Sequence, residues 1–282
     1  MGELPADVRL GAIRLRVGDV ELERRFYERT IGLETLGDAN GVISLGVAGG
    51  EPLVELVSDP DAPPRPHGTT GLFHLALLTP SRAHLADALR RVVESGSRLS
   101  GASDHLVSEA LYLSDPEGNG IELYRDRPRS EWPATDDGLR MATLPLDLEG
   151  VLAEAPAVPT VPKMAPGTTL GHVHLNVGNL DDAGRFWVDA LGFDVVTRYG
   201  ASALFVSAGG YHHHVGLNTW EGVGAPPPPA GARGLAYFEV VLPDTAAVDA
   251  AAERLERVAT VEREDGRVRA TDPSGNAVVV RS

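Results

Sequence analysis

The sequence predicts an α+β fold built from four βαβββ-like modules, numbered 1 to 4 along the chain. Two internal repeats and a recurring Asp-Pro-x-Gly-Asn turn support this prediction, because repetition at a fixed offset is the signature of a fold assembled from copies of one unit. The modules are expected at about 8–58, 71–126, 168–220 and 233–282.

The first repeat relates modules 1 and 3. Residues 10–36 and 170–196 align at a constant offset of 160 residues. Each segment reads as a strand, a short helix, a glycine that would end the helix, and a second strand. The identical pairs are Leu10/Leu170, Gly11/Gly171, Leu15/Leu175, Val17/Val177, Gly18/Gly178, Arg25/Arg185, Phe26/Phe186 and Gly32/Gly192.

The second repeat relates modules 2 and 4. Residues 71–80 and 234–243 align as strands at an offset of 163 residues. Each strand is followed by an Ala-rich amphipathic segment that predicts a helix, and each module ends in an Asp-Pro-x-Gly-Asn turn and a last strand. The predicted helices are Ala83–Ser95 and Ala246–Val258, and the turn-and-strand segments are 114–125 and 271–282.

A Pro- and Ala-rich connection separates modules 2 and 3. It contains PAVPTVPKMAP, a composition that favours an extended linker. We therefore expect an N-terminal domain at 1–130, a linker at 131–166 and a C-terminal domain at 167–282.

The composition excludes several classes of function. The chain has no Cys, which rules out disulfides, thiolate metal sites and cysteine nucleophiles. A net charge of −15 disfavours nucleic acid and anionic membranes as partners. No run approaches the roughly 18 apolar residues of a membrane span, and the N-terminus lacks an apolar signal core. These observations predict a cytoplasmic protein.

The segment 105–122, HLVSEALYLSDPEGNGIE, is the most informative part of the chain. Its DPEGNG portion is typical of a tight turn, because proline presets φ and Gly and Asn tolerate positive φ. In the strand that follows, Glu122 faces away from its apolar neighbours Ile121 and Leu123. A carboxylate on the inner face of a strand is costly unless a positive group meets it. A metal ion is one such group.

Four modules with these turns resemble the vicinal oxygen chelate superfamily, which includes glyoxalases, bleomycin-resistance proteins and extradiol dioxygenases. The resemblance implies two eight-stranded, incompletely closed barrels, each formed by two modules. It also implies metal ligands on the first and last strands of a module. Modules 2 and 3 have His74, His172 and Glu122 at these positions. The remaining aligned positions are Ala12 and Tyr237 on first strands and Glu55, Gly216 and Val279 on last strands.

The implied ligand set predicts how the modules pair. Two histidines and one carboxylate form the facial triad of non-haem iron oxygenases. His74, His172 and Glu122 can bind one ion only if module 2 pairs with module 3. We therefore expect a catalytic barrel from modules 2 and 3 and a structural barrel from modules 1 and 4. Glu55, which lacks partners of this kind, is expected to be a structural carboxylate.

Residues 105–122 also resemble the extradiol ring-cleaving dioxygenase signature, and together with GYHHHVGLNTW at 210–220 they resemble the two-barrel catechol 2,3-dioxygenases of the Bacillus-type group. The resemblance implies cleavage of catechol or a substituted catechol by O2 to a 2-hydroxymuconic semialdehyde, with Fe(II), or alternatively Mn(II), as cofactor. The signature positions that fit are His105, Leu111, Tyr112, Asp115, Pro116, Gly118 and Glu122.

The same resemblance assigns roles to residues beside the metal. His213 takes the place of an acid/base histidine, and Tyr112 that of a tyrosine that hydrogen-bonds the substrate. If 210–220 is a strand, His212 and His214 face away from His213, and a shift of one residue would exchange their roles. Residues expected near the substrate without binding the metal are His105, Asp104, His174 and His214.

Two alternatives from other classes stay open. A glyoxalase-type isomerase or lyase would use the same fold, although such chemistry generally needs a fuller ligand set and Gly216 cannot supply a donor. A non-catalytic small-molecule-binding protein would use the fold without a metal triad. A homo-oligomer is compatible with either class.

Overall fold

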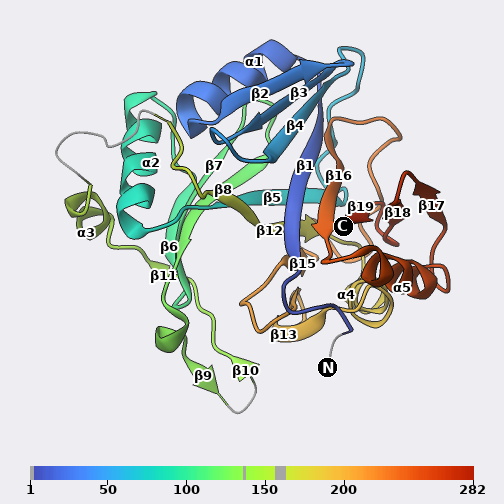
Figure 1. Cartoon of the computed structure of the whole chain (residues 1–282). Helices are drawn as coiled ribbons and strands as arrows, with labels where there is room; N and C mark the ends of the chain where they lie inside the picture. Colours follow the sequence, from blue (N-terminus) through green and yellow to red (C-terminus); the bar gives the residue numbers. More distant parts are fainter. Residues whose placement is uncertain (1–2, 136–137, 156–162) are drawn as a thin grey trace. The chain divides into compact units, whose positions relative to one another are not determined.

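A computed structural model describes residues 3–135, 138–155 and 163–282. It contains the four expected modules, each with a first strand, a helix and three further strands (Figure 1). Module 1 consists of β1 (Arg9–Val17), α1 (Val20–Phe26), η1 (Tyr27–Ile31), β2 (Glu34–Ala39), β3 (Val42–Gly46) and β4 (Pro52–Ser58). Module 2 consists of β5 (Gly71–Leu78), α2 (Arg82–Glu94), β6 (Gly101–Asp104), β7 (Ser108–Ser114) and β8 (Gly120–Asp126).

The second half of the chain repeats this plan. Module 3 consists of β12 (Thr169–Asn176), α4 (Leu180–Gly184), η3 (Arg185–Ala190), β13 (Asp194–Tyr199), β14 (Ala203–Ser207) and β15 (Val215–Asn218). Module 4 consists of β16 (Gly234–Val241), α5 (Thr245–Leu255), β17 (Val261–Glu264), β18 (Arg267–Thr271) and β19 (Ala277–Arg281). In both modules with a short first helix, that helix continues into a π-helical turn, η1 or η3.

The strand order confirms the predicted pairing of modules. One sheet has the order β17-β18-β19-β16-β1-β4-β3-β2 and therefore combines modules 4 and 1. The other has the order β11-β6-β7-β8-β5-β12-β15-β14-β13 and combines modules 2 and 3. The second sheet has nine strands where eight were expected. Its extra edge strand β11 (Leu144–Pro145) pairs with β6 and comes from the segment expected to be a linker.

That segment is not uniformly extended in its described part. It contains the short strands β9 (Ala134–Thr135) and β10 (Gly138–Leu139), β11, and helix α3 (Leu148–Ala153), and η2 (Arg129–Glu131) leads into it. The Asp147 carboxylate caps α3 by accepting from the N–H of Gly150, a local stabilisation that outweighs the Pro-rich surroundings. The Pro-rich stretch 156–162 lies outside the described residues.

Helix caps and glycines set the ends of the helices. Asp19 caps α1 and Ser81 caps α2, each accepting from a backbone N–H in the first turn. Gly32 ends the first helix of module 1 with φ +90, as its position in the repeat predicts. A Cβ there would come within 2.7 Å of the Arg91 guanidinium, which would have to move.

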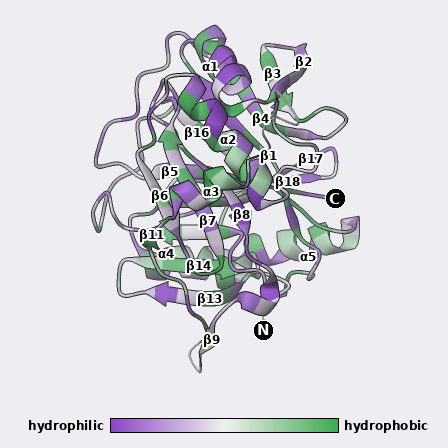
Figure 2. Cartoon of the chain, turned by 90° about the vertical axis from the view of Figure 1, so that its left-hand side faces the viewer, coloured by the Kyte–Doolittle hydropathy of each residue, from purple (hydrophilic) through white to green (hydrophobic). Residues whose placement is uncertain are grey.

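Contacts divide the described residues into two compact units. One unit includes Ala62–Phe73 and Gly171–Ser282 with the start of β1, and in it α5 packs against β18 and β19. The other includes Arg16–Asp61 and the described part of His74–Leu170, and in it α2 packs against β8. Helix α5 is mostly pale green in Figure 2, as expected for its Ala-rich sequence. Among the described residues, no helix is long and apolar enough to cross a membrane.

Candidate metal centre

The first and last strands of module 2 bring His74 and Glu122 together. Strands β5 and β8 are parallel neighbours in which Ala76 lies opposite Glu122, so Glu122 and His74 lie on the same face of the sheet. The Nε2 atom of His74 is 3.0 Å from Oε2 of Glu122, and both side chains are buried. Two donors about 2.1 Å from one ion and at right angles are about 3 Å apart, so the pair fits a shared ion.

Tyr112 and His105 form a hydrogen-bonded pair beside these two residues. Tyr112 lies on β7 opposite Glu122 on β8, and its ring centroid is 5.7 Å from that of His74. Its hydroxyl is 2.7 Å from Nε2 of His105, whose Nδ1 is 2.7 Å from the carbonyl of Ala142. Because a carbonyl only accepts, the neutral His105 ring carries its proton on Nδ1 and accepts at Nε2 from Tyr112.

The ionisation of Tyr112 is strongly disfavoured. Burial raises the pKa of Tyr112 well above its usual value, and the negative charge of Glu122 raises that pKa further. The phenol therefore keeps its proton throughout the neutral range and acts as a donor.

Asp104 shapes the turn that precedes Tyr112. Its carboxylate accepts from the N–H of Leu106, which has a positive φ of 69, and from the guanidinium of Arg127 at 2.7 Å. Arg127 also reaches the buried Glu109, to which Arg125 donates at 2.7 Å. Asp104 thus holds the backbone that carries His105.

His172 and His213 lie together in module 3. His172 is buried on β12, and the centroid of its ring is 4.1 Å from that of His213 and 6.1 Å from that of His212. The Nδ1 atoms of His212 and His213 are 2.8 Å apart, so one of them donates and the other accepts. Of the three consecutive histidines, His213 is therefore the one whose ring lies nearest to that of His172.

The histidine tract does not follow the strand geometry expected from the sequence. Strand β15 begins only at Val215, and the preceding Gly209 and Gly210 have positive φ angles, so the tract bends and does not alternate. His212 consequently stays beside His213, with ring centroids 4.7 Å apart. The Nδ1 atom of His214 is 2.8 Å from the hydroxyl of Ser207, and its ring packs against other aromatic rings, those of Phe193 and Tyr211.

His174 lies two residues after His172 and belongs to an aromatic cluster. Its ring centroid is 5.2 Å from that of Phe73 and from that of Trp220, and 5.5 Å from that of Phe205. His174 pairs with Gly216, and a Cβ at Gly216 would come within 2.8 Å of the His174 ring. Gly216 is the repeat equivalent of Glu122. In module 3 the imidazole of His174 therefore fills the space that a side chain at this position would occupy.

The predicted ligands form a group that could hold a metal ion. One donor atom each from His74, Glu122 and His172 lies within 4.8 Å of the other two. Of the described residues, these three form the one group of three or more such donors that lie this close together. All three residues are buried.

Some features of the site could not be assigned from sequence patterns. The carbonyl of Ala142 contacts His105 from the segment expected to be a linker, and no side-chain motif marks a backbone oxygen. Phe73 and Trp220 pack around His174 from distant parts of the sequence. Their one signal is position, because Phe73 directly precedes His74 and Trp220 lies two residues after the end of β15.

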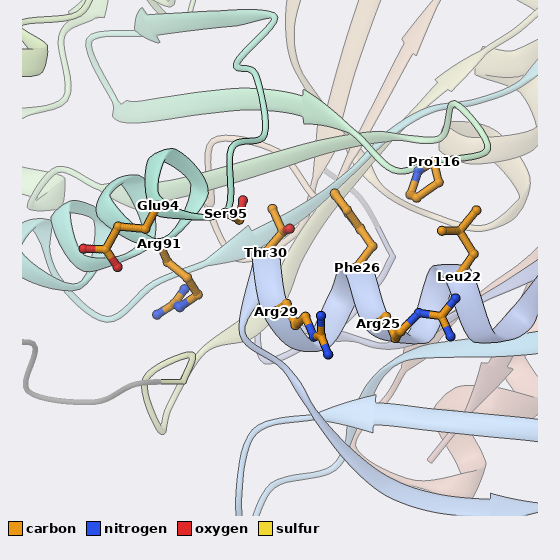
Figure 3. Close-up of a pocket in the computed structure, with 9 residues that line it drawn as sticks. All are labelled: Leu22, Arg25, Phe26, Arg29, Thr30, Arg91, Glu94, Ser95 and Pro116. Atoms are coloured by element: carbon orange, nitrogen blue, oxygen red, sulfur yellow. The ribbon is translucent and has the colours of Figure 1, made fainter.

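An open cavity of about 570 Å³ lies elsewhere, between the first helix of module 1 and the end of α2 (Figure 3). None of the predicted site residues lines it. The lining residues are Leu22, Arg25, Phe26, Arg29, Thr30, Arg91, Glu94, Ser95 and Pro116.

Comparison with known families identifies the class of protein. The model of the Glyoxalase/Bleomycin resistance protein/Dioxygenase superfamily matches residues 9–123 and 169–280. The chain therefore belongs to this superfamily, as its repeats and turns predicted, and the predicted α+β fold of four modules is confirmed.

A curated relative defines the chain more closely. The chain is 42% identical over 283 residues to the Bacillus subtilis (strain 168) protein named catechol-2,3-dioxygenase, and the alignment covers 99% of both chains. The chain is thus a catechol-2,3-dioxygenase-like enzyme.

Solved structures share the fold at low identity. A Bacillus subtilis structure described as a candidate dioxygenase has a TM-score of 0.68 at 14% identity, covering 96% of this chain and 84% of that one. Glyoxalase I from Zea mays has a TM-score of 0.60 at 17% identity, covering 97% and 92%.

Proposed function

We propose that the chain cleaves the ring of catechol, or of a substituted catechol, in an extradiol reaction with O2 that gives a 2-hydroxymuconic semialdehyde. The reaction would use Fe(II) bound by His74, His172 and Glu122. The observation that carries this proposal is the buried group of these three donors in a chain 42% identical to a protein named catechol-2,3-dioxygenase. Two histidines and one carboxylate leave coordination positions open for substrate and O2.

The charge of the donor set supports a catecholic substrate. Two neutral imidazoles and one carboxylate reduce the charge of a divalent ion to +1, which matches a catechol monoanion. Bound Fe(II) would supply the redox chemistry that lets O2 react with a catecholate. Mn(II) accepts the same oxygen and nitrogen donors and is the alternative ion.

Residues of the chain would handle the protons. An imidazole that accepts at Nδ1 carries its proton on Nε2, so His213 can hold a transferable proton at Nε2 when His212 donates to it. The Tyr112 hydroxyl, kept protonated and hydrogen-bonded to His105, would orient a substrate oxygen. The aromatic rings around His174 would form an apolar wall for the ring of the substrate.

Oxygen uptake tests the function directly. The protein would be loaded anaerobically with Fe(II), or separately with Mn(II), and mixed with catechol and air. Consumption of O2 together with a stoichiometric yellow ring-fission product would support extradiol cleavage. Bound metal with no uptake for a panel of substituted catechols would contradict it and favour the isomerase alternative. If the protein binds no metal, the alternative of a non-catalytic small-molecule-binding protein would be favoured.

The His213→Phe variant is expected to retain its metal and lose turnover. Removing an acid/base group from a proton-transfer step slows the reaction by about 10²- to 10⁴-fold, whereas the three proposed ligands remain. Turnover and iron content would be measured on the same preparation. His67→Phe, at an exposed position, is the matched control and should behave like the parent. An unchanged rate in His213→Phe would assign the proton transfer to another residue.

A further inference from the structure

The Asp-Pro-x-Gly-Asn turns of modules 2 and 4 have the same internal structure. Asp115 accepts four hydrogen bonds, from the N–H groups of Glu117 and Asn119, the amide of Asn119 and the hydroxyl of Tyr27. Four donors around one carboxyl favour its ionised form. In module 4, Asp272 likewise accepts four hydrogen bonds, from the N–H groups of Ser274 and Asn276, the amide of Asn276 and the indole of Trp187.

Each turn is joined to the first helix of the preceding module. Tyr27 and Trp187 occupy equivalent repeat positions, and each donates to the turn aspartate. The N–H of Gly18 donates to the carboxylate of Glu117 at 2.8 Å, and the equivalent Gly178 donates to the hydroxyl of Ser274 at 3.0 Å. Figure 3 shows Pro116 of the first turn lying over Leu22 and Phe26 of α1.

The two joints differ at one buried position. Module 1 has Glu23 where the repeat gives Ala183 in module 3. Glu23 is fully buried, and its Oε1 accepts from the N–H of Glu117 at 2.9 Å. That same N–H also donates to Asp115, so the two carboxyl groups lie on either side of one amide. The Oε2 atom of Glu23 has no N–H or O–H donor among the described residues.

Two buried carboxyl groups that accept from the same N–H cannot both be ionised without a large cost. The surroundings of Asp115 supply its donors, whereas Glu23 has one, so the proton belongs on Glu23. Burial first, and then the charge of Asp115, raises the pKa of Glu23 to about 9, against the lowering effect of the hydrogen bond from the N–H of Glu117. Burial raises the pKa of Asp115 to about 6 against the lowering effect of its hydrogen bonds. Tyr27, the remaining titratable neighbour, stays neutral because burial raises its pKa well above the usual value.

We propose that Glu23 and Asp115 share one proton at neutral pH, and that this proton fastens helix α1 to the turn that precedes β8. Glu23 is thereby a positioning residue for the start of the strand that carries Glu122. The hydrogen bond runs from the protonated Oε2 of Glu23 to the Asp115 carboxylate. Because β8 begins at Gly120, directly after Asn119 of the turn, a loosened joint frees the first residues of that strand.

The sign of the pH dependence follows from linkage. In the unfolded chain Glu23 ionises near its ordinary value of 4.5, whereas in the folded chain it keeps its proton up to about pH 9. The unfolded state therefore releases a proton that the folded state retains, so stability falls as the pH rises between these values. The contribution of Glu23 is complete below about pH 4.5 and is lost as the pH passes about 9.

The test is the pH dependence of thermal unfolding for the full-length parent and Glu23→Gln. Glutamine has the shape of a protonated carboxyl and can donate to Asp115 at every pH. The two proteins should have similar Tm values at pH 5, and the variant should be more stable by at least about 2 °C at pH 9. A constant difference in Tm between the parent and Glu23→Gln from pH 5 to pH 9 would overturn the proposal.

Two further measurements separate the proton from a merely structural role. Infrared spectra at pH 7 should show the C=O stretch of a protonated carboxyl in the parent and a weaker band in Glu23→Gln. Amide exchange at Glu117 and Asn119, compared between the two proteins at the same pH, should be faster in the parent only at alkaline pH. Stabilisation of the parent by Ca²⁺ that is absent in the variant would instead mean that the pair binds a cation. None of these results depends on the proposed catalytic function.

Discussion

Replacing Glu122 with Gln is expected to abolish turnover and to weaken iron binding by more than about 100-fold. The substitution keeps the shape of the side chain and can still hydrogen-bond His74, but it removes the one negative charge among the three proposed ligands. Substituting a residue that only supports a ligand typically costs 10- to 100-fold in metal affinity, so the loss of a ligand itself should exceed that range. His74→Ala should have the same effect on both quantities.

Iron content after anaerobic loading, a Fe(II) titration and oxygen uptake would be measured on the same preparations. Glu55→Gln is the matched control, because Glu55 lies on β4, the last strand of module 1, at the repeat position of Glu122. That variant should bind iron and turn over like the parent. Normal iron content in Glu122→Gln would refute the ligand assignment, whatever the effect on the rate.

The Trp187→Ala variant should lose about 3–5 kcal/mol of unfolding free energy, because truncating a fully buried aromatic side chain leaves a large cavity. Trp187 lies in η3, its indole stacks on Phe238 with ring centroids 5.6 Å apart, and its Nε1 donates to Asp272 at 3.1 Å. The variant therefore also leaves the buried Asp272 with one donor fewer. The loss would be measured by urea denaturation followed by circular dichroism.

Two companion variants separate packing from hydrogen bonding. Trp187→Phe retains most of the packing and removes the donor, so it should cost about 1–3 kcal/mol. Trp220→Ala, at a side chain 49% exposed, should cost about 1 kcal/mol or less. Equal losses of unfolding free energy for Trp187→Ala and Trp220→Ala would contradict the prediction. They would mean that Trp187 does not stabilise the contact between η3 and the turn of module 4.

The internal repeats carried most of the fold prediction. Glycines at equivalent positions ended the first helices of modules 1 and 3, and the first strands began within a few residues of the expected positions. The pairing of modules 2 and 3 was predictable because only one combination places His74, His172 and Glu122 near one ion. That inference needed chemistry as well as pattern, since periodicity alone does not say which strands become neighbours.

Features that depend on tertiary contacts were not predictable in the same way. Strand β11 forms because its backbone groups pair with β6, a contact that leaves no local signal in the sequence. The bend of the histidine tract follows from the positive φ angles of Gly209 and Gly210, which a strand-like reading of 210–220 did not include. The burial of Glu23 is equally hidden, because an acidic residue in the first turn of a helix usually faces water.

The contact between His174 and Gly216 constrains how this enzyme can change by mutation. A carboxylate at residue 216 would add a fourth protein ligand, as isomerases of this fold generally need, yet a Cβ there would lie 2.8 Å from the His174 imidazole. A single substitution at Gly216 is therefore blocked by sterics, and His174 would have to become smaller first. Replacing His174 alone would in turn disrupt the aromatic cluster it forms with Phe73 and Trp220. We therefore expect residues 174 and 216 to change together wherever a fourth ligand is added to the three-ligand site proposed here.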